Sequence, residues 1–189
     1  MEPLKTFYTS ERAEWRDWLY ENFEKENEIW FVFSMKNAGK KSLSYNDAVE
    51  ETLCFGWIDS TIKNLDSLHR IQRFSPRKKG SGYSRANIER LIWLESKGMI
   101  HPKVRERILE IIKIPYDFPA DIIEEMRRED IVWKNYEKFP EAYKRIRIAY
   151  IDAARKRPLE FKKRLENFIN KTRENKLIKG FGGIEKYYK

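Results

Sequence analysis

All strand-like segments of this sequence lie before Pro76, and only helical patterns follow it. Residues 28–35 are rich in aromatic and β-branched side chains, as in a buried strand. Residues 56–62 and 68–74 are also strand-like, and the turn-forming residues 64–67 between them predict a hairpin. Prolines that can begin helices follow at Pro102, Pro119, Pro140 and Pro158. The pattern predicts an α+β fold, in which a small antiparallel sheet is packed by helices and followed by an all-helical C-terminal module.

Helix boundaries in the first hundred residues have local signals. Ser44, followed three residues later by an acid, predicts the capped start of a helix that Gly56 ends. Ser84 is placed to cap a further helix, with Gly98 as its stop. We therefore expect a helix–strand–helix–hairpin–helix unit over residues 1–100.

Length and composition favour one domain with one core, since 41% of the 189 residues are apolar and 14% are aromatic. Within it we expect an α+β core at residues 1–100 and a helical module at residues 101–175 packed on that core. The tail, residues 176–189, is predicted to be mobile unless its aromatic side chains dock.

No stretch of the sequence approaches the roughly 18 apolar residues that a membrane span requires. The N-terminal segment lacks the apolar core of a signal peptide. Cys54 is the single cysteine, and a chain that cannot form an internal disulfide suits a reducing compartment. We expect a cytoplasmic protein without a membrane span.

Positive charge is concentrated in the C-terminal quarter. Residues 144–189 hold 15 Lys and Arg against 5 Asp and Glu, whereas residues 1–143 hold 24 against 25. A second local excess lies between Leu68 and Arg90, where Glu89 is the single acid. Basic regions attract nucleic acid or phosphate-bearing ligands, although solvated helical faces give the same pattern.

The segment from Gln72 to Asn87 holds the strongest candidate site. Cationic side chains, glycines that let backbone amides approach a ligand, and polar groups at a helix N-terminus are the ingredients of a phosphate site. The predicted anion-binding residues are Arg73, Arg77, Lys78, Ser81, Ser84 and Asn87. The predicted supporting residues are Asp59, Arg70 and Gln72, because hairpin pairing would bring the aspartate against an arginine of the next strand. The spacing is not that of a Walker loop, and a solvated basic loop before a capped helix is the alternative interpretation.

Other chemistry-bearing residues are few. Cys54, between apolar neighbours, is typical of a buried and unreactive thiol. Glu50, Glu51 and Asp59 could supply an acid–base pair, but adjacent helical residues point about 100° apart, so at most one glutamate can face the aspartate. One cysteine and two widely spaced histidines do not form a zinc site. We predict no metal site and no cofactor.

The runs Tyr45–Ser60, Gln72–Lys78 and Ser81–Asn87 resemble the YdeI/OmpD-associated family. Ile151–Leu165 resembles, more loosely, the basic helical module at that family's C-terminus. The resemblance extends over nearly the whole chain and is strongest across the first hundred residues. It implies a bacteriocin-protection-like protein with a YjbR-like and frataxin-like α+β fold.

These observations favour a binding module over an enzyme, because no recognised catalytic motif is present. The expected partner is a phosphate-containing ligand or nucleic acid, and nucleic acid is preferred because Trp57, Phe74 and Tyr83 could stack on bases near the basic loop. Two alternatives remain: a small-molecule enzyme with a pocket around Asp59 and Cys54, and a stress or bacteriocin-protection interaction protein.

Overall fold

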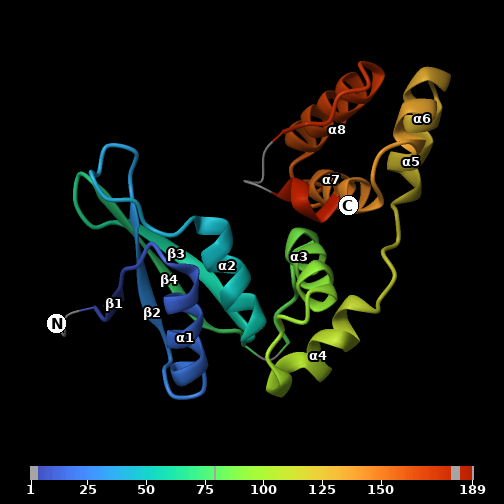
Figure 1. Cartoon of the computed structure of the whole chain (residues 1–189). Helices are drawn as coiled ribbons and strands as arrows, with labels where there is room; N and C mark the ends of the chain where they lie inside the picture. Colours follow the sequence, from blue (N-terminus) through green and yellow to red (C-terminus); the bar gives the residue numbers. More distant parts are fainter. Residues whose placement is uncertain (1–3, 79, 180–183, 189) are drawn as a thin grey trace. The chain divides into compact units, whose positions relative to one another are not determined.

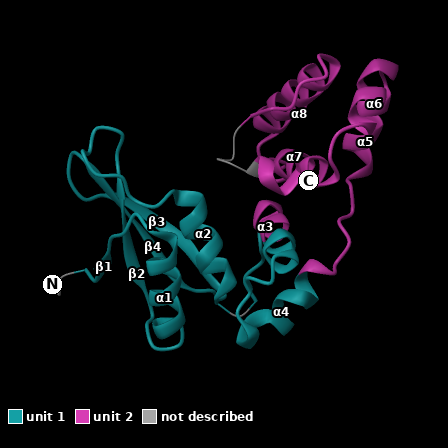
Figure 2. Ribbon diagram, viewed as in Figure 1, with its two compact units in different colours: residues 1–83, 91–111 teal, residues 84–90, 112–189 magenta. Residues whose placement is uncertain are grey.

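A computed structural model describes residues 4–78, 80–179 and 184–188, which form two compact units (Figures 1 and 2). Unit 1 comprises residues 1–83 and 91–111, and unit 2 comprises residues 84–90 and 112–189. Helix α3, Arg85–Ser96, contributes residues to both units. The strands belong to unit 1 and the C-terminal region is helical, so the expected α+β class is confirmed.

Unit 1 is built on a four-stranded sheet with the strand order β1–β2–β4–β3. The strands are β1 Thr6–Phe7, β2 Ile29–Ser34, β3 Trp57–Asn64 and β4 His69–Pro76. β1 pairs with β2 in parallel, whereas the other two pairings are antiparallel. The sheet is therefore mixed and not purely antiparallel as expected, because the two residues of β1 are too few to give a strand pattern in the sequence.

Helices α1, Arg12–Asn22, and α2, Tyr45–Cys54, pack on one face of this sheet, called here the helix-covered face (Figure 1). The ring of Trp15 lies 5.0 Å from that of Phe31 and 5.8 Å from that of Phe74, centroid to centroid. Nε1 of Trp15 also donates a hydrogen bond to the carbonyl of Ala48 at 3.1 Å. One tryptophan of α1 thus joins α2 to two strands of the sheet, and helix α4, Pro102–Ile112, completes the helices of unit 1.

The predicted helix caps and the predicted glycine stop are observed at the expected residues. Oγ of Ser44 accepts a hydrogen bond from the backbone N–H of Asp47 at 3.1 Å and caps α2. Oγ of Ser84 accepts from the backbone N–H of Asn87 at 3.3 Å at the start of α3. Gly56 follows α2 with φ of +72°, a conformation that side chains other than glycine rarely adopt.

Unit 2 is helical in its described residues, with α5 Ala120–Arg127, α6 Asp130–Glu137, α7 Glu141–Asp152, α8 Pro158–Arg173 and the 3-10 helix η1 Ile184–Tyr188. Its core includes Tyr143 of α7 and Phe168 of α8, which are 0% and 1% exposed. The ring of Tyr188 lies 5.4 Å from that of Tyr143, so a tail aromatic packs on this core. Residues 180–183 and 189 of the predicted mobile tail lie outside the described residues. No helix in the described part of the chain has the length and apolar character needed to cross a membrane.

Candidate anion-binding pocket

Arg77, the central residue of the predicted loop site, is used by the loop itself. Its side chain is buried, and its Nη1 donates a hydrogen bond to the carbonyl of Gly82 at 2.7 Å. The guanidinium carbon lies 3.7 Å from the centroid of the Tyr83 ring. Burial, together with the nearby charge of Arg107, lowers the pKa of Arg77. This arginine therefore closes the loop of residues 77–83 and is not presented to solvent.

The remaining loop residues are also engaged locally, apart from the exposed Lys78. Oγ of Ser81 donates to the carbonyl of Lys78 at 2.7 Å, which tightens the turn. In unit 2, Ser84 caps α3, and Oδ1 of Asn87 accepts from Nη1 of Arg90 at 2.9 Å. The binding role of these residues stays a prediction, and their observed contacts are those of a folded loop and a capped helix.

Asp59 does not pair with an arginine of β4. In the ladder it lies opposite Phe74, and its Oδ2 accepts a hydrogen bond from Oη of Tyr45 at 2.7 Å. Arg73 is next to Phe74 in β4 and therefore projects from the other face of the sheet. There its Nε donates to Oε2 of Glu28 at 2.7 Å and lowers the pKa of that carboxyl group. The alternation of side chains along β4 separates Arg73 from Asp59, and the expected pair is not formed.

The three predicted supporting residues, Asp59, Arg70 and Gln72, line one pocket of about 950 Å³ in unit 1. Its other walls come from the end of β2, from the loop between β2 and α2, and from the first residue of α2. Nε2 of the buried Gln72 donates to the carbonyl of Ser60 at 3.0 Å across the hairpin. The hairpin and the β2–α2 loop thus both contribute walls of the pocket.

Positive charge dominates this pocket. Its cationic lining residues are Lys36, Lys40, Lys41 and Arg70, and its carboxylate is that of Asp59. Within the described part of the chain, none of the four cations forms an ion pair with a carboxylate. Clefts lined by one sign of charge concentrate counter-ions, so the pocket is suited to an anion.

Apolar side chains complete the lining. Phe33 and Leu43 contribute to the walls, and Leu43 is buried. Met35, Tyr45 and Ile62 also line the pocket and are 37%, 46% and 55% exposed. Ligand sites combine apolar surface with a few placed polar groups, so this composition suits an anion that also carries an apolar part.

The β2–α2 loop lines the pocket, although the sequence did not predict a site there. The strand expected at residues 28–35 is observed as β2, and a turn at residues 36–40 follows it. Lys36, Lys40 and Lys41 surround this turn and precede the capped start of α2. Three lysines around a glycine-containing turn before a helix N-terminus were the available signal.

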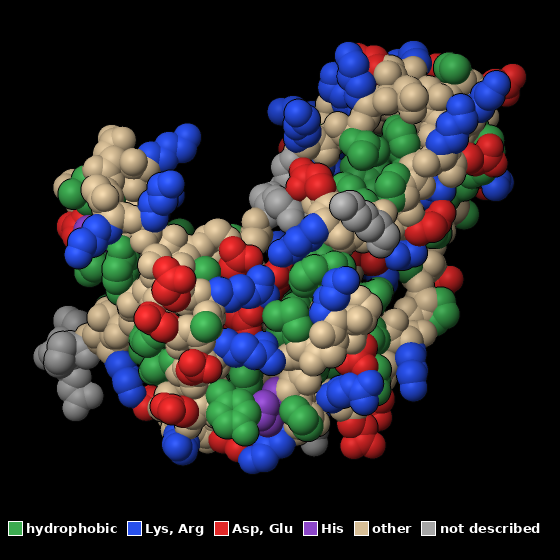
Figure 3. All heavy atoms as spheres, in the orientation of Figure 1, with side chains coloured by type: hydrophobic (Ala, Val, Ile, Leu, Met, Phe, Trp, Pro, Cys, Tyr) green, Lys and Arg blue, Asp and Glu red, His purple; other side chains and the backbone are tan. Residues whose placement is uncertain are grey.

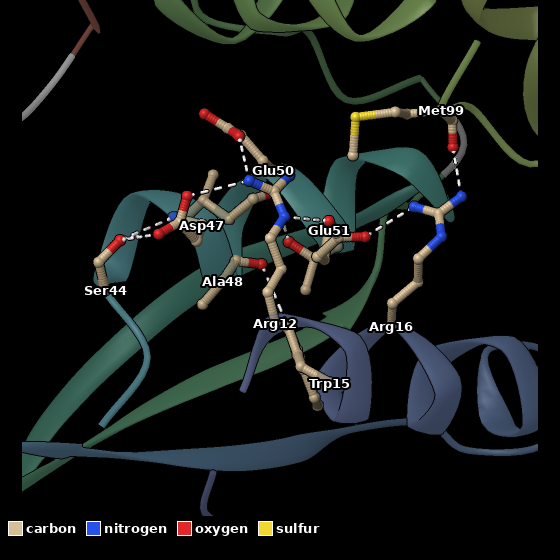
Figure 4. Close-up of polar contacts among 11 residues, drawn as sticks. Arg12, Trp15, Arg16, Ser44, Asp47, Ala48, Glu50, Glu51 and Met99 are labelled. Atoms are coloured by element: carbon tan, nitrogen blue, oxygen red, sulfur yellow. Dashed lines mark hydrogen bonds and ion pairs between the residues drawn. The ribbon is translucent and has the colours of Figure 1, made fainter. Parts of the chain in front are cut away.

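Glu50 and Glu51 do not form an acid–base pair with Asp59, because α1 holds both (Figure 4). Nη1 of Arg12 lies 3.0 Å from Oε2 of Glu50, and Nε of Arg12 donates to Glu51. Nη1 of Arg16 donates to the other oxygen of Glu51 at 2.7 Å. The two glutamates are almost completely buried, so these ion pairs join α1 to α2.

Cys54 lies in the interior of unit 1. Cys54 is completely buried, and burial raises the pKa of its thiol to about 12. The residue lines none of the pocket at Asp59. Within the described residues, no group of three or more His, Cys, Asp or Glu side chains could hold a metal ion.

Two family models match different parts of the chain. Residues 115–175 match the family described as bacteriocin-protection, YdeI or OmpD-associated, and residues 7–107 match a domain of unknown function, DUF8412. No curated protein and no solved structure matches the chain. The YdeI/OmpD-associated resemblance is therefore limited to the C-terminal part, and the prediction that it covers nearly the whole chain and is strongest in the first hundred residues was wrong. The wider frataxin-like and YjbR-like relationship stays a prediction. The match at residues 7–107 covers more than half of the 189 residues of the chain. The chain therefore belongs to the family of the domain of unknown function DUF8412.

Proposed function

We propose that unit 1 is a binding module for a small phosphate-bearing ligand, which occupies the pocket lined by Lys36, Lys40, Lys41 and Arg70. The observation that carries this proposal is the presence of four cations without ion-pair partners among the described residues, against one carboxylate, in a pocket of about 950 Å³. That volume is in the range of small-molecule sites, roughly 300 to 1,000 Å³. Lysine binds phosphate as a mobile point charge, and arginine can add a bidentate contact.

A small ligand is favoured over nucleic acid because the aromatic side chains near the basic loop are not free to stack on bases. Trp57 and Phe74 are 1% and 0% exposed, and Nε1 of Trp57 donates to the carbonyl of Phe23 at 3.0 Å. Tyr83 is covered by the guanidinium of Arg77. Single-stranded nucleic acid needs exposed stacking platforms along a basic groove, and the pocket offers apolar walls inside a concavity instead.

Binding is favoured over catalysis by the state of the candidate reactive groups. Asp59 is hydrogen-bonded to Tyr45, and the buried thiol of Cys54 lies outside the pocket. The carboxylate of Asp59 repels an anion that occupies the same pocket. The effect of removing this charge on ligand binding therefore separates a binding function from a catalytic one.

The experiment is a fluorescence titration of the full chain with N-methylanthraniloyl adenosine monophosphate, which carries one phosphate and an aromatic group. Removing one cation that lies about 4 Å from a phosphate weakens binding about fivefold in a water-like medium. The Lys40→Gln/Lys41→Gln variant should therefore bind about 25-fold more weakly. The charge-matched control Lys25→Gln/Lys97→Gln, at two exposed positions outside the pocket, should bind like the parent.

Asp59→Asn tests the same pocket with the opposite sign. It removes a repelling charge at constant shape, so it should strengthen binding of the probe by about fivefold at most. A Lys40→Gln/Lys41→Gln variant that binds as tightly as the parent would refute the proposal. Single-stranded RNA that binds with a steeper salt dependence than the probe, and that the same lysine variant releases, would instead assign the cations to nucleic acid.

A further inference from the structure

One end of unit 1 exposes aliphatic side chains to solvent. This end, called here the hairpin end, consists of residues 62–70 together with Met35 and the β2–α2 loop that follows it. Ile62, Leu65 and Leu68 are 55%, 50% and 40% exposed. The backbone N–H of Met35 donates to the carbonyl of Leu68 at 2.8 Å, which places the exposed Met35 beside the hairpin turn. Four large aliphatic side chains therefore share one end of the sheet.

Cationic side chains belong to the same end of unit 1. They are Lys36, Lys40, Lys41 and Arg70, whereas Nζ of Lys63 lies 4.8 Å from the centroid of the Trp30 ring. Figure 3 shows blue cationic and green apolar side chains gathered over the end of unit 1 at which β3 and β4 are joined. The acid of the turn, Asp66, is used within it, because Oδ1 accepts from the backbone N–H groups of Leu68 and His69 at 2.7 and 2.8 Å. The hairpin end is thus both apolar and positively charged.

We propose that the hairpin end docks on an anionic lipid bilayer, with Leu65, Leu68 and Met35 inserted at the level of the headgroups and the lysines on lipid phosphates. Surfaces that bind such membranes combine aliphatic residues with Lys and Arg. Protein interfaces are instead depleted in lysine and enriched in Tyr, Trp and Arg. Nucleic-acid platforms rely on aromatic stacking, and the exposed apolar residues of the turn are aliphatic. The combination of leucine, methionine and lysine therefore favours lipid.

The inference goes beyond the pocket proposal and can fail separately. Lys36, Lys40, Lys41 and Arg70 belong to both surfaces, but Leu65, Leu68 and Lys63 do not line the pocket. Variants at the two leucines therefore test docking alone. Both leucine side chains are about half exposed, so their replacement should leave the melting temperature within a few degrees of the parent.

The first experiment is co-sedimentation of the full chain with vesicles of phosphatidylcholine, with and without about one third phosphatidylglycerol. Each Lys or Arg near an anionic surface strengthens binding about fivefold, so four cations against one acid should give a preference of about a hundredfold for the anionic vesicles. Leu65→Ser/Leu68→Ser should weaken that binding about 25-fold, about fivefold for each half-exposed leucine. The same variant should bind the fluorescent nucleotide as the parent does.

A second measurement locates the contact. Because Cys54 is buried, a thiol-reactive environment-sensitive dye can be directed to Leu65→Cys, with Lys25→Cys as the matched exposed position in unit 1. Anionic vesicles should shift the emission of the dye to the blue at position 65 and leave it unchanged at position 25. Equal binding of Leu65→Ser/Leu68→Ser and parent, no shift at position 65, or equal binding to both vesicle types would each overturn the proposal.

Discussion

Replacing Arg12 by Met tests whether the buried carboxylates of α2 depend on α1 for their counter-charge. The side chains of Glu50 and Glu51 are 0% and 1% exposed, whereas that of Arg12 is 32% exposed. Removing one partner of a buried ion pair costs about 3 to 5 kcal/mol. Arg12 is about one third exposed, and Arg16 still neutralises Glu51, so we expect a loss near the lower limit, about 3 kcal/mol. Urea unfolding followed by tryptophan fluorescence measures it in unit 1, which holds five of the six tryptophans.

A second variant separates lost charge pairing from lost packing. Glu50→Gln in the Arg12→Met background removes a buried carboxylate that has lost its ion pair with Arg12, so the double variant should be more stable than Arg12→Met by about 1 to 2 kcal/mol. Lys103→Met is the matched control, because its pair with Glu24 is exposed and should contribute less than about 1 kcal/mol. A loss below about 1 kcal/mol for Arg12→Met, or a double variant less stable than the single one, would refute the reasoning.

Three further predictions concern the interior of unit 1. Because burial raises the pKa of Cys54 from 9.0 to about 12, a disulfide reagent should label it slowly at pH 8 in the native chain and rapidly in denaturant. The pKa of Cys54 is higher in the folded than in the unfolded chain, so the contribution of the neutral thiol to folding stability is complete below pH 9 and is lost as the pH rises toward 12. Rapid labelling of the native chain at pH 8 would contradict this reasoning. Gly56→Ala should lower the free energy of unfolding in urea by about 1 to 2 kcal/mol, because the φ of Gly56 is +72° and the new Cβ would lie 3.3 Å from Cγ1 of Val104. Gly82→Ala is the control: its Cβ would enter open space, so the loss should be less than about 0.5 kcal/mol. Arg77→Met should lower the free energy of unfolding by about 2 kcal/mol and Lys78→Met by less than about 0.5 kcal/mol; equal losses would show that the buried contacts of Arg77 do not stabilise the loop.

The parts of the fold that the sequence predicts correctly are those set by local chemistry. Ser44 and Ser84 cap helices, and Gly56 and Gly98 follow helices with positive φ, because these roles depend on one or two neighbouring residues. Pro158 is the first residue of α8 as expected, since its fixed φ suits that position. The parallel pairing of β1 with β2 was not predictable in this way, because it joins residues more than twenty positions apart.

The candidate site was predicted only in part, for a reason of geometry. The sequence grouped Arg73 with Arg77 because they are close in the chain, but strand alternation turns Arg73 to the other face and burial turns Arg77 into the loop. Arg70 and Gln72 reach the pocket because they share the face of β4 that looks toward the β2–α2 loop. Lys36 and Lys40 meet them only after the sheet has formed, so no local pattern contained the pocket.

Counting charges along the chain does not predict where an anion binds, because the count does not show which cations form ion pairs with acids. Segment 144–189 has the largest excess of Lys and Arg, but several of its cations are neutralised by acids from earlier residues of unit 2. These pairs are Arg145 with Glu89, Arg155 with Asp121 and Arg173 with Glu129, at 2.6, 2.8 and 2.6 Å. The segment before it is balanced in sequence, yet the cations of its pocket face a single carboxylate. An anion is attracted by the positive charge that remains after ion pairing. This remaining charge depends on which acids the fold brings within about 4 Å of the cations. The electrostatic field at the pocket is therefore a property of the tertiary structure and not of the composition of its segment.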